Sequence, residues 1–415
     1  MDFAIFFVGL FCLLFRKYSY AIAIIIFLAS TYFQLPLDPK YQNFLFAHNT
    51  SDLGILLYIC FFATIALKYG VTFSHPIIKY VHYFYVFLAC SALYDIFSGV
   101  AILDVITYLK NWIFLSVVYI FPYINDLYKT KGFRIIYNLC LLCCLLILIQ
   151  RFSGIEFFSM RVLEGRGIKP PSYSIYCAAL CLINVWNDNK LRRCIHLIIF
   201  ILPVILNLKM TYAVSIFAIY IVYLMSSSLI SKMKRVVIGG VFLLSAMVVL
   251  VVNDSFQERF FSTASEINTI SNDEVSGNFS YRLLHSYERC IYILKEPITF
   301  IRGIGFISEE NFNKSISELG VWNSKKDDVA QLDTGDIAWS IFFVRLGFIG
   351  LFFYLLMYFK LMNSFKPYMN VSKWASYFFS VMLIFICFTS FGNTIITTGD
   401  FFILPFLFSR MQKVG

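Results

Sequence analysis

The chain has 415 residues, of which 60% are hydrophobic and only 14% are charged. Soluble domains carry roughly 45–50% apolar and about 25% charged residues, so this composition excludes an ordinary soluble protein and indicates one that crosses a membrane several times. The net charge is +10, but the lysines and arginines stand in short clusters between apolar stretches and form no single basic stripe. We therefore expect no nucleic-acid partner.

Apolar stretches near the length that spans a bilayer, about 20 residues, recur along the whole chain. Candidate spans lie near residues 2–15, 18–35, 53–69, 80–97, 104–123, 135–150, 173–187, 194–208, 211–230, 236–252, 337–360, 374–396 and 399–409. The first and last are short for a full crossing, so we expect 12 or 13 transmembrane helices. The predicted fold class is all-α, a polytopic integral membrane protein.

Basic clusters in alternate short loops predict the orientation. One such cluster holds Lys129, Lys131 and Arg134, and by the positive-inside rule these loops face the cytoplasm. The longer polar loops then face outward, and three regions follow. These are residues 1–253 with transmembrane helices and an outward loop at about 151–172, residues 254–336 as a large outward loop, and residues 337–415 with the C-terminal transmembrane helices.

The eleven cysteines give no sign of a metal site. Ten of them lie in or beside apolar stretches, and Cys140, Cys143 and Cys144 stand at helical spacing, as small packing residues do. No pair of CxxC motifs recurs at the spacing of a zinc site, so we expect neither a metal nor another cofactor.

The outward loop 151–172 is rich in arginine, including Arg161 and Arg166, and ends in two prolines before the next span. Proline is favoured in the first turn of a helix, where Ser172 or Ser174 is a candidate N-cap. A helix N-terminus beside basic residues suits an anionic group such as a pyrophosphate. The alternative is that these arginines only solvate the loop and contact lipid headgroups.

Residues 281–296 in the large loop have the periodicity of a helix with two unlike sides. One side holds Leu284, Tyr287, Ile291 and Leu294, and the other holds Arg282, His285, Arg289 and Glu296. In such a helix Arg282, His285 and Arg289 can point together at one ligand. The alternative is an amphipathic helix that lies on the membrane surface with a solvated basic face.

Two motifs follow this helix. Arg302-Gly303-Ile304-Gly305-Phe306 predicts a tight turn that depends on glycine, with Ser308 as the N-cap of a short helix over 308–320. Asp333 and Asp336 stand directly before the next span, where one of them is a candidate general base for a sugar hydroxyl. Capping of that span is the alternative role.

Ionisable residues within or beside the spans are further candidates. Arg345 falls about two turns into a predicted span, and a charge at that depth is costly unless it is paired or lines a cavity. Snorkelling toward the headgroups is the alternative. Asp95, Asp104 and Asp400 lie near predicted outer ends of spans.

The chain resembles the bacterial O-antigen and capsule repeat-unit polymerases (Wzy-type) in the arrangement of two outward loops. The first contains arginines and ends in Pro-Pro-Ser, and the second is long and contains Tyr281-Arg282, GIGF and DTGD. Gly347 and Gly350 in the next span fit the same arrangement. This family is related to the O-antigen ligases, which place a histidine just before that span. Here the segment reads DTGDIAW, which favours a polymerase over a ligase.

The resemblance implies a metal-independent glycosyltransferase of the GT-C type, with a large helical periplasmic loop, in the bacterial inner membrane. Its substrates would be undecaprenyl-pyrophosphate-linked oligosaccharides, with membrane lipid, a chain-length regulator and a flippase as partners. Catalytic candidates are Asp333, Asp336 and His285, and pyrophosphate-binding candidates are Arg161, Arg166, Arg282, Arg289, Arg302 and Arg345.

Two other classes of membrane protein are alternatives to a polymerase, and one feature of the sequence argues against each. A lipid-linked oligosaccharide flippase or other transporter also has many spans and basic cavities, but usually lacks so long an outward insertion. A non-catalytic membrane scaffold has no need of arginines gathered at one membrane face.

Overall fold

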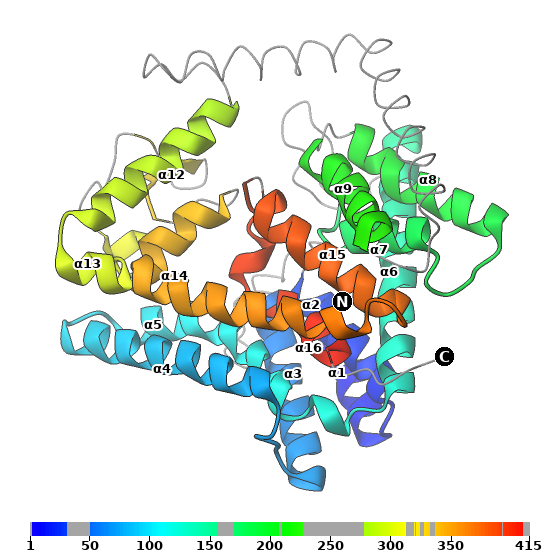
Figure 1. Ribbon diagram of the computed structural model, residues 1–415, viewed down its shortest axis with the longest axis horizontal. Coiled ribbons are helices and arrows are strands. Elements are labelled where there is room, and N and C mark those ends of the chain that lie inside the picture. Colours follow the sequence, from blue (N-terminus) through cyan, green and yellow to red (C-terminus); the bar gives the residue numbers. More distant parts are fainter. Residues whose placement is uncertain are drawn as a thin grey trace.

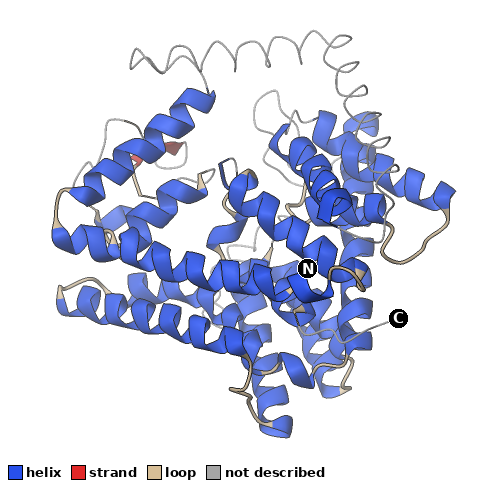
Figure 2. Ribbon diagram, viewed as in Figure 1, coloured by secondary structure: helices blue, strands red, loops and turns tan. Residues whose placement is uncertain are grey.

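The computed structural model describes residues 2–30, 50–155, 170–206, 210–226, 278–312, 319, 321–323, 328–332, 337–391 and 393–409. Within these ranges the chain is almost entirely helical (Figure 2). The exception is a short antiparallel hairpin of β1 (Val321–Asn323) and β2 (Asp328–Ala330), in which Val321 pairs with Ala330. This hairpin was not predicted from the sequence.

The first half of the chain forms α1 (Asp2–Leu14), α2 (Tyr18–Ala29), α3 (Thr50–Tyr69), α4 (Pro76–Phe97), α5 (Ile102–Leu109), η3 (Lys110–Tyr119), η4 (Phe121–Tyr123), α6 (Asp126–Ser153), α7 (Ser174–Ile183), α8 (Lys190–Leu206) and α9 (Met210–Ser226). The second half forms α12 (Asn278–Leu294), α13 (Pro297–Arg302), η6 (Glu309–Asn311), α14 (Ala338–Ser364), η7 (Lys366–Tyr368), α15 (Lys373–Cys387), η8 (Thr389–Phe391), η9 (Ile395–Thr397), η10 (Gly399–Phe402) and α16 (Ile403–Phe408).

Among the described residues, six helical stretches are long and apolar enough to cross a membrane. They are Thr50–Tyr69, Pro76–Phe97, Ile102–Tyr119, Asp126–Ser153, Ala338–Tyr368 and Lys373–Phe391. Five shorter apolar helices accompany them. The membrane character expected from the composition is thus confirmed, while the predicted span at 236–252 lies outside the described residues.

Local sequence signals explain where the long helices begin and end. Pro76 occupies the first turn of α4, and His75 Nδ1 accepts a hydrogen bond of 3.3 Å from the backbone N–H of Ile77. Asn125 caps α6 in the same way, and α6 ends at Gly154 with φ of +71°. A left-handed residue of this kind is a common helix stop because glycine has no Cβ to clash.

Helices α4 and α14 lie side by side and run in opposite directions (Figure 1). The ring of Tyr83 meets that of Phe353, and Phe87 packs against Gly350, where an added Cβ would lie 2.3 Å from the Phe87 ring. Small residues allow such close approach of helices in membranes. The pairing carries the end of α4 to the first turns of α14, where the polar loop attaches.

The glycine-dependent turn predicted at 302–306 is confirmed, and it bends α14. Gly303 and Gly347 have φ of +68° and +61°, and the N–H of Ile304 donates to the carbonyl of Val344 at 2.7 Å. A Cβ on Gly303 would lie 2.3 Å from the Val344 oxygen, and one on Gly347 would lie 2.4 Å from the Gly303 nitrogen. The two backbones therefore touch, and the turn is fixed to the middle of α14.

Candidate functional site

His285 faces α14 and is completely buried. Its Nδ1 lies 2.8 Å from the hydroxyl of Ser340, which also lies 3.1 Å from the Ser286 hydroxyl. Nε2 has no hydrogen-bond partner within the described part of the chain. Burial, and then the positive charge of Arg289, lower the pKa of His285 to about 3, so the ring is neutral at physiological pH.

Arg289 is also buried, and its guanidinium holds the loop that returns to α14. It donates to Glu288 Oε2 at 3.1 Å, to the carbonyl of Gln331 at 3.3 Å and to the carbonyl of Leu319. Burial lowers the pKa of Arg289 to about 10, which leaves it charged at neutral pH. Its hydrogen bonds go to the protein itself, so it does not point with Arg282 at an open ligand site, as the helical pattern had suggested.

Glu309 also binds the loop that returns to α14, at residues 331 and 332. Its two oxygens each accept a backbone N–H at 2.7 Å, one from Gln331 and one from Leu332. The predicted cap at Ser308 is confirmed, because its hydroxyl accepts from the N–H of Asn311 at 3.3 Å. Nothing in the sequence distinguished Glu309 from its acidic neighbours, since its partners lie more than twenty residues away.

Arg302 forms an ion pair with Asp95 at the end of α4. The other oxygen of Asp95 accepts the N–H of Phe306 at 2.8 Å, and the carboxylate is almost fully buried. Asp104, on the next helix, accepts from the side-chain amide of Asn311 at 2.6 Å. Two carboxylates from the membrane helices therefore bind the loop that follows α13.

Arg345 binds that loop from the other side. Its guanidinium donates to the carbonyl of Gly305 at 3.0 Å and to that of Ile307, and it donates to the Tyr108 hydroxyl at 2.7 Å. The group also lies 3.9 Å from the centre of the Tyr108 ring, a cation–π distance. Arg345 is thus hydrogen-bonded to groups of this chain and directed into the protein, as expected for a charge on an apolar helix.

Arg282 lies on the same side of α12 as His285, one turn earlier, and is half-buried. The remaining sequence-predicted site residues, Asp333, Asp336, Arg161 and Arg166, lie outside the described residues. Ser340, the partner of His285, follows Asp336 by four positions in the chain. Of the predicted set, the structure therefore brings His285 to the start of α14, with Arg282 three positions earlier on the same helix.

A broken line of side-chain hydrogen bonds, whose parts are linked only through neighbouring residues of the chain, leads from the start of α14 to α9. The indole N–H of Trp339 donates to the hydroxyl of Ser390 at 2.9 Å, and the neighbouring Thr389 hydroxyl lies 2.7 Å from that of Ser215. Thr389 and Ser390 form the short η8 turn after α15. This turn lies between the first residues of α14 and the first turns of α9.

The line continues to the residues that follow the 151–172 loop. The side-chain amide of Asn393 donates to the Tyr212 hydroxyl at 3.0 Å, and the Ser172 hydroxyl lies 3.2 Å from the same Tyr212 oxygen. Ser172 is therefore not a helix cap, and α7 begins after Tyr173 without a side-chain cap. We call these three neighbouring groups of hydrogen-bonded side chains the loop junction: Ser172, Tyr212, Ser215, Trp339, Thr389, Ser390 and Asn393.

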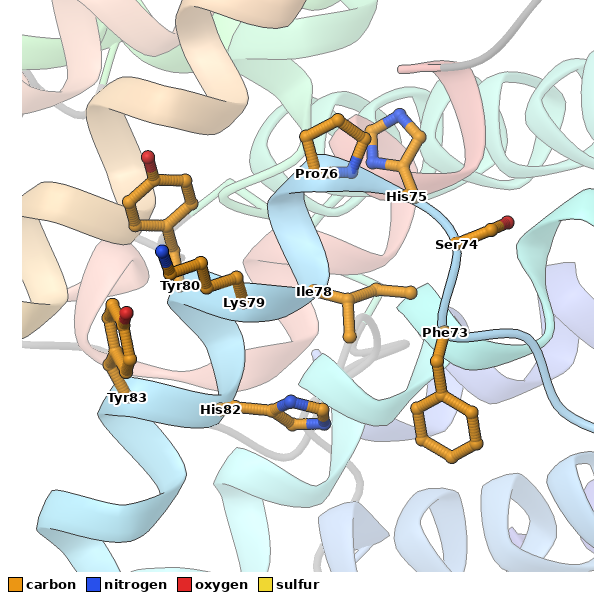
Figure 3. A pocket seen from close by; sticks show the side chains of 9 residues that line it. All are labelled: Phe73, Ser74, His75, Pro76, Ile78, Lys79, Tyr80, His82 and Tyr83. Atoms are coloured by element: carbon orange, nitrogen blue, oxygen red, sulfur yellow. The ribbon is translucent and has the colours of Figure 1, made fainter.

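A surface hollow lies elsewhere, and it does not bring together polar side chains from separate parts of the chain. It has a volume of about 520 Å³ and is lined by residues 73–83, including Lys79 and His82 (Figure 3). It lies at the beginning of α4, whereas Asp95 and the bound loop lie at its end. All of its lining comes from one segment, so it gathers no side chains from separate parts of the chain.

Comparison with protein-family models and with curated proteins gives no match. Within the described ranges, no three His, Cys, Asp or Glu side chains are grouped as a metal site requires.

Proposed function

We propose that this chain is a metal-independent glycosyltransferase of GT-C type that joins undecaprenyl-pyrophosphate-linked oligosaccharide units into a polysaccharide, an O-antigen or a capsule, at the periplasmic face of the bacterial inner membrane. The observation that carries the proposal is the loop junction. It gathers residues next to both arginine-bearing loops around η8 and the start of α9, although Ser172 and Trp339 are 167 positions apart (339 − 172). A reaction between two lipid-linked units needs such a meeting of polar groups at one membrane face.

In this proposal Arg282 and one of Arg161 and Arg166 bind the pyrophosphate of the growing chain. The hydroxyl of the incoming unit attacks the anomeric carbon, and the bond from that carbon to the pyrophosphate oxygen breaks. Fixed arginines stabilise the negative charge that develops on the leaving group. Arg289, Arg302 and Arg345 are not needed for this role, because protein groups already bind them.

The hydroxyl proton passes to a carboxylate, Asp333 or Asp336. His285 is the weaker candidate, since its Nε2 is fully buried and its pKa of about 3 makes it a poor proton acceptor at neutral pH. Its bond to Ser340 instead fixes α12 against the start of α14, four residues after Asp336. In this proposal His285 is a positioning residue that holds α12, which carries Arg282, against α14.

The test uses cells in which the chain's own gene is replaced by variants, with surface glycans separated by length. Arg282→Ala should leave glycolipid that carries a single repeat unit but no long chains, and Arg282→Lys should restore them only in part, because lysine cannot bind pyrophosphate with two parallel hydrogen bonds. Lys295→Ala, at the exposed turn after α12, is the matched control and should keep the full length distribution.

Other results would point elsewhere. Loss of the single-unit glycolipid from the outer face would indicate a flippase or other transporter. Long chains that are made but not transferred to their final acceptor would indicate a ligase. Unchanged glycans in Arg282→Ala, with normal protein levels, would reject the assignment of the site.

A further inference from the structure

Helix α12 buries its polar face and exposes its apolar one. His285 and Arg289 are fully buried against α14 and the returning loop, whereas Tyr287 is 62% exposed. Ile291 and Leu294 follow Tyr287 at spacings of four and three, so the three side chains form one stripe along the helix. This orientation is the reverse of a surface helix whose basic face is solvated.

The apolar stripe continues across the turn into α13. Ile298 and Ile301 are nearly half exposed, and no residue of α13 is buried. Phe300 is 37% exposed while its ring stacks on Phe348 of α14, with ring centres 5.1 Å apart. Helices α12 and α13 thus form a hairpin with an exposed apolar face, the hairpin face: Tyr287, Ile291, Leu294, Ile298 and Ile301.

The hairpin is attached beside helices that are apolar enough to span a membrane. Gly303, just after α13, contacts the carbonyl of Val344, which lies about 9 Å along α14 from its first residue at 1.5 Å per residue. Arg302 pairs with Asp95, two positions before the end of α4. The end of α13 therefore lies beside the last turn of α4, which is a candidate membrane span.

The neighbouring surface is apolar as well. Phe97 at the end of α4 is 86% exposed, and Leu93 on the same helix and Leu103 on α5 are also exposed. These residues belong to helices that are long and apolar enough to cross a membrane, and in such helices exposed apolar side chains would face lipid. Figure 1 shows α13 next to the ends of α4 and α5 at one edge of the molecule. The hairpin face thus extends a lipid-facing surface.

We propose that α12 and α13 form an interfacial hairpin whose apolar face lies among the acyl chains just below the lipid headgroups. Tyr287 then sits in the belt where amphipathic aromatic rings are enriched. Lys295 and Glu296, at the exposed turn, reach the headgroups. Insertion would hold the buried face of α12, and Arg282 with it, at the membrane surface. This inference does not depend on the proposed reaction.

The test places p-azidophenylalanine at position 287, 291 or 298, so that a fluorophore can be attached without involving the eleven cysteines. The full-length protein is reconstituted in phosphatidylcholine nanodiscs with or without lipids that carry doxyl quenchers at a shallow and at a deep position of the acyl chain. Replacement of Phe352, exposed in the middle of α14, is the lipid-facing control, and replacement of Lys190, exposed at the start of α8, is the solvent-facing control.

We expect doxyl lipid to roughly halve the fluorescence at all three hairpin positions, as at 352, and iodide in the buffer to have little effect there. Quenching by iodide but not by doxyl lipid would show a hairpin in water and overturn the proposal. Protection from both quenchers, as a second copy of this chain or another protein would give, would also overturn it. Because the replaced side chains are exposed, the variants should fold.

Discussion

Replacement of Arg302 by alanine should strongly destabilise the protein, and a second substitution at Asp95 should restore part of the loss. In Arg302→Ala, the Asp95 carboxylate, which is 1% exposed in the native structure, loses its counterion. Leaving a buried charge unpaired costs about 3–5 kcal/mol, and the value should be near the lower end because the Arg302 side chain is itself 14% exposed. Asp95→Asn removes the stranded charge and keeps an oxygen to accept the N–H of Phe306.

The double variant Arg302→Ala/Asp95→Asn should therefore be more stable than Arg302→Ala alone, which is a non-additive result expected only for directly coupled residues. Equilibrium unfolding in mixed detergent micelles, followed by circular dichroism, measures the free energy of each variant. Lys295→Ala is the control for loss of an exposed cation. If the double variant were as unstable as Arg302→Ala, or less stable, the ion pair would not be what holds the loop on α4.

The same unfolding assay tests two further features. Gly347→Ala should lower the free energy of unfolding more than Gly70→Ala does. Both positions have positive φ, but only at Gly347 does the new Cβ meet backbone atoms of Gly303, whereas nothing lies within 4 Å at Gly70. Equal losses of stability in the two variants would contradict the contact between Gly347 and Gly303. Acidification from pH 7 to pH 5 should lower the free energy of unfolding by on the order of 2 kcal/mol. In the unfolded chain His285 takes up a proton below its ordinary pKa of 6.5, whereas in the folded chain its pKa is about 3. Protonation therefore favours the unfolded state as the pH falls between these two values. In His285→Gln this pH-dependent part of the stability should be absent. The same dependence of the unfolding free energy on pH in this variant and in the parent would contradict the prediction.

The helices themselves were largely predictable. The predicted spans 53–69 and 80–97 correspond to Thr50–Tyr69 and Pro76–Phe97, because a chain in lipid must satisfy its backbone hydrogen bonds within each helix. The end of the predicted span 374–396 was wrong. Helix α15 ends at Cys387, and Thr389 and Ser390 turn their hydroxyls to other helices, a long-range event that hydropathy does not report.

The environment of α12 was not predictable in the same way. The periodicity separated its two sides correctly, but which side is buried depends on the partners that other segments supply. Ser340 binds His285, and the carbonyls of Leu319 and Gln331 bind Arg289, so the polar side is the one covered. In water an exposed apolar side would be unfavourable, and next to lipid this penalty disappears.

The buried arginines change how the site must be tested. Arg289, Arg302 and Arg345 all resemble ligand-binding residues in the sequence, yet each binds carbonyls or carboxylates of this chain. Replacing any of them should disturb the loop around residues 302–332 and reduce activity whether or not it touches substrate. Loss of activity alone therefore cannot identify a pyrophosphate ligand here. A variant, Arg282→Ala included, supports that role only when activity falls while the free energy of unfolding stays close to that of the parent.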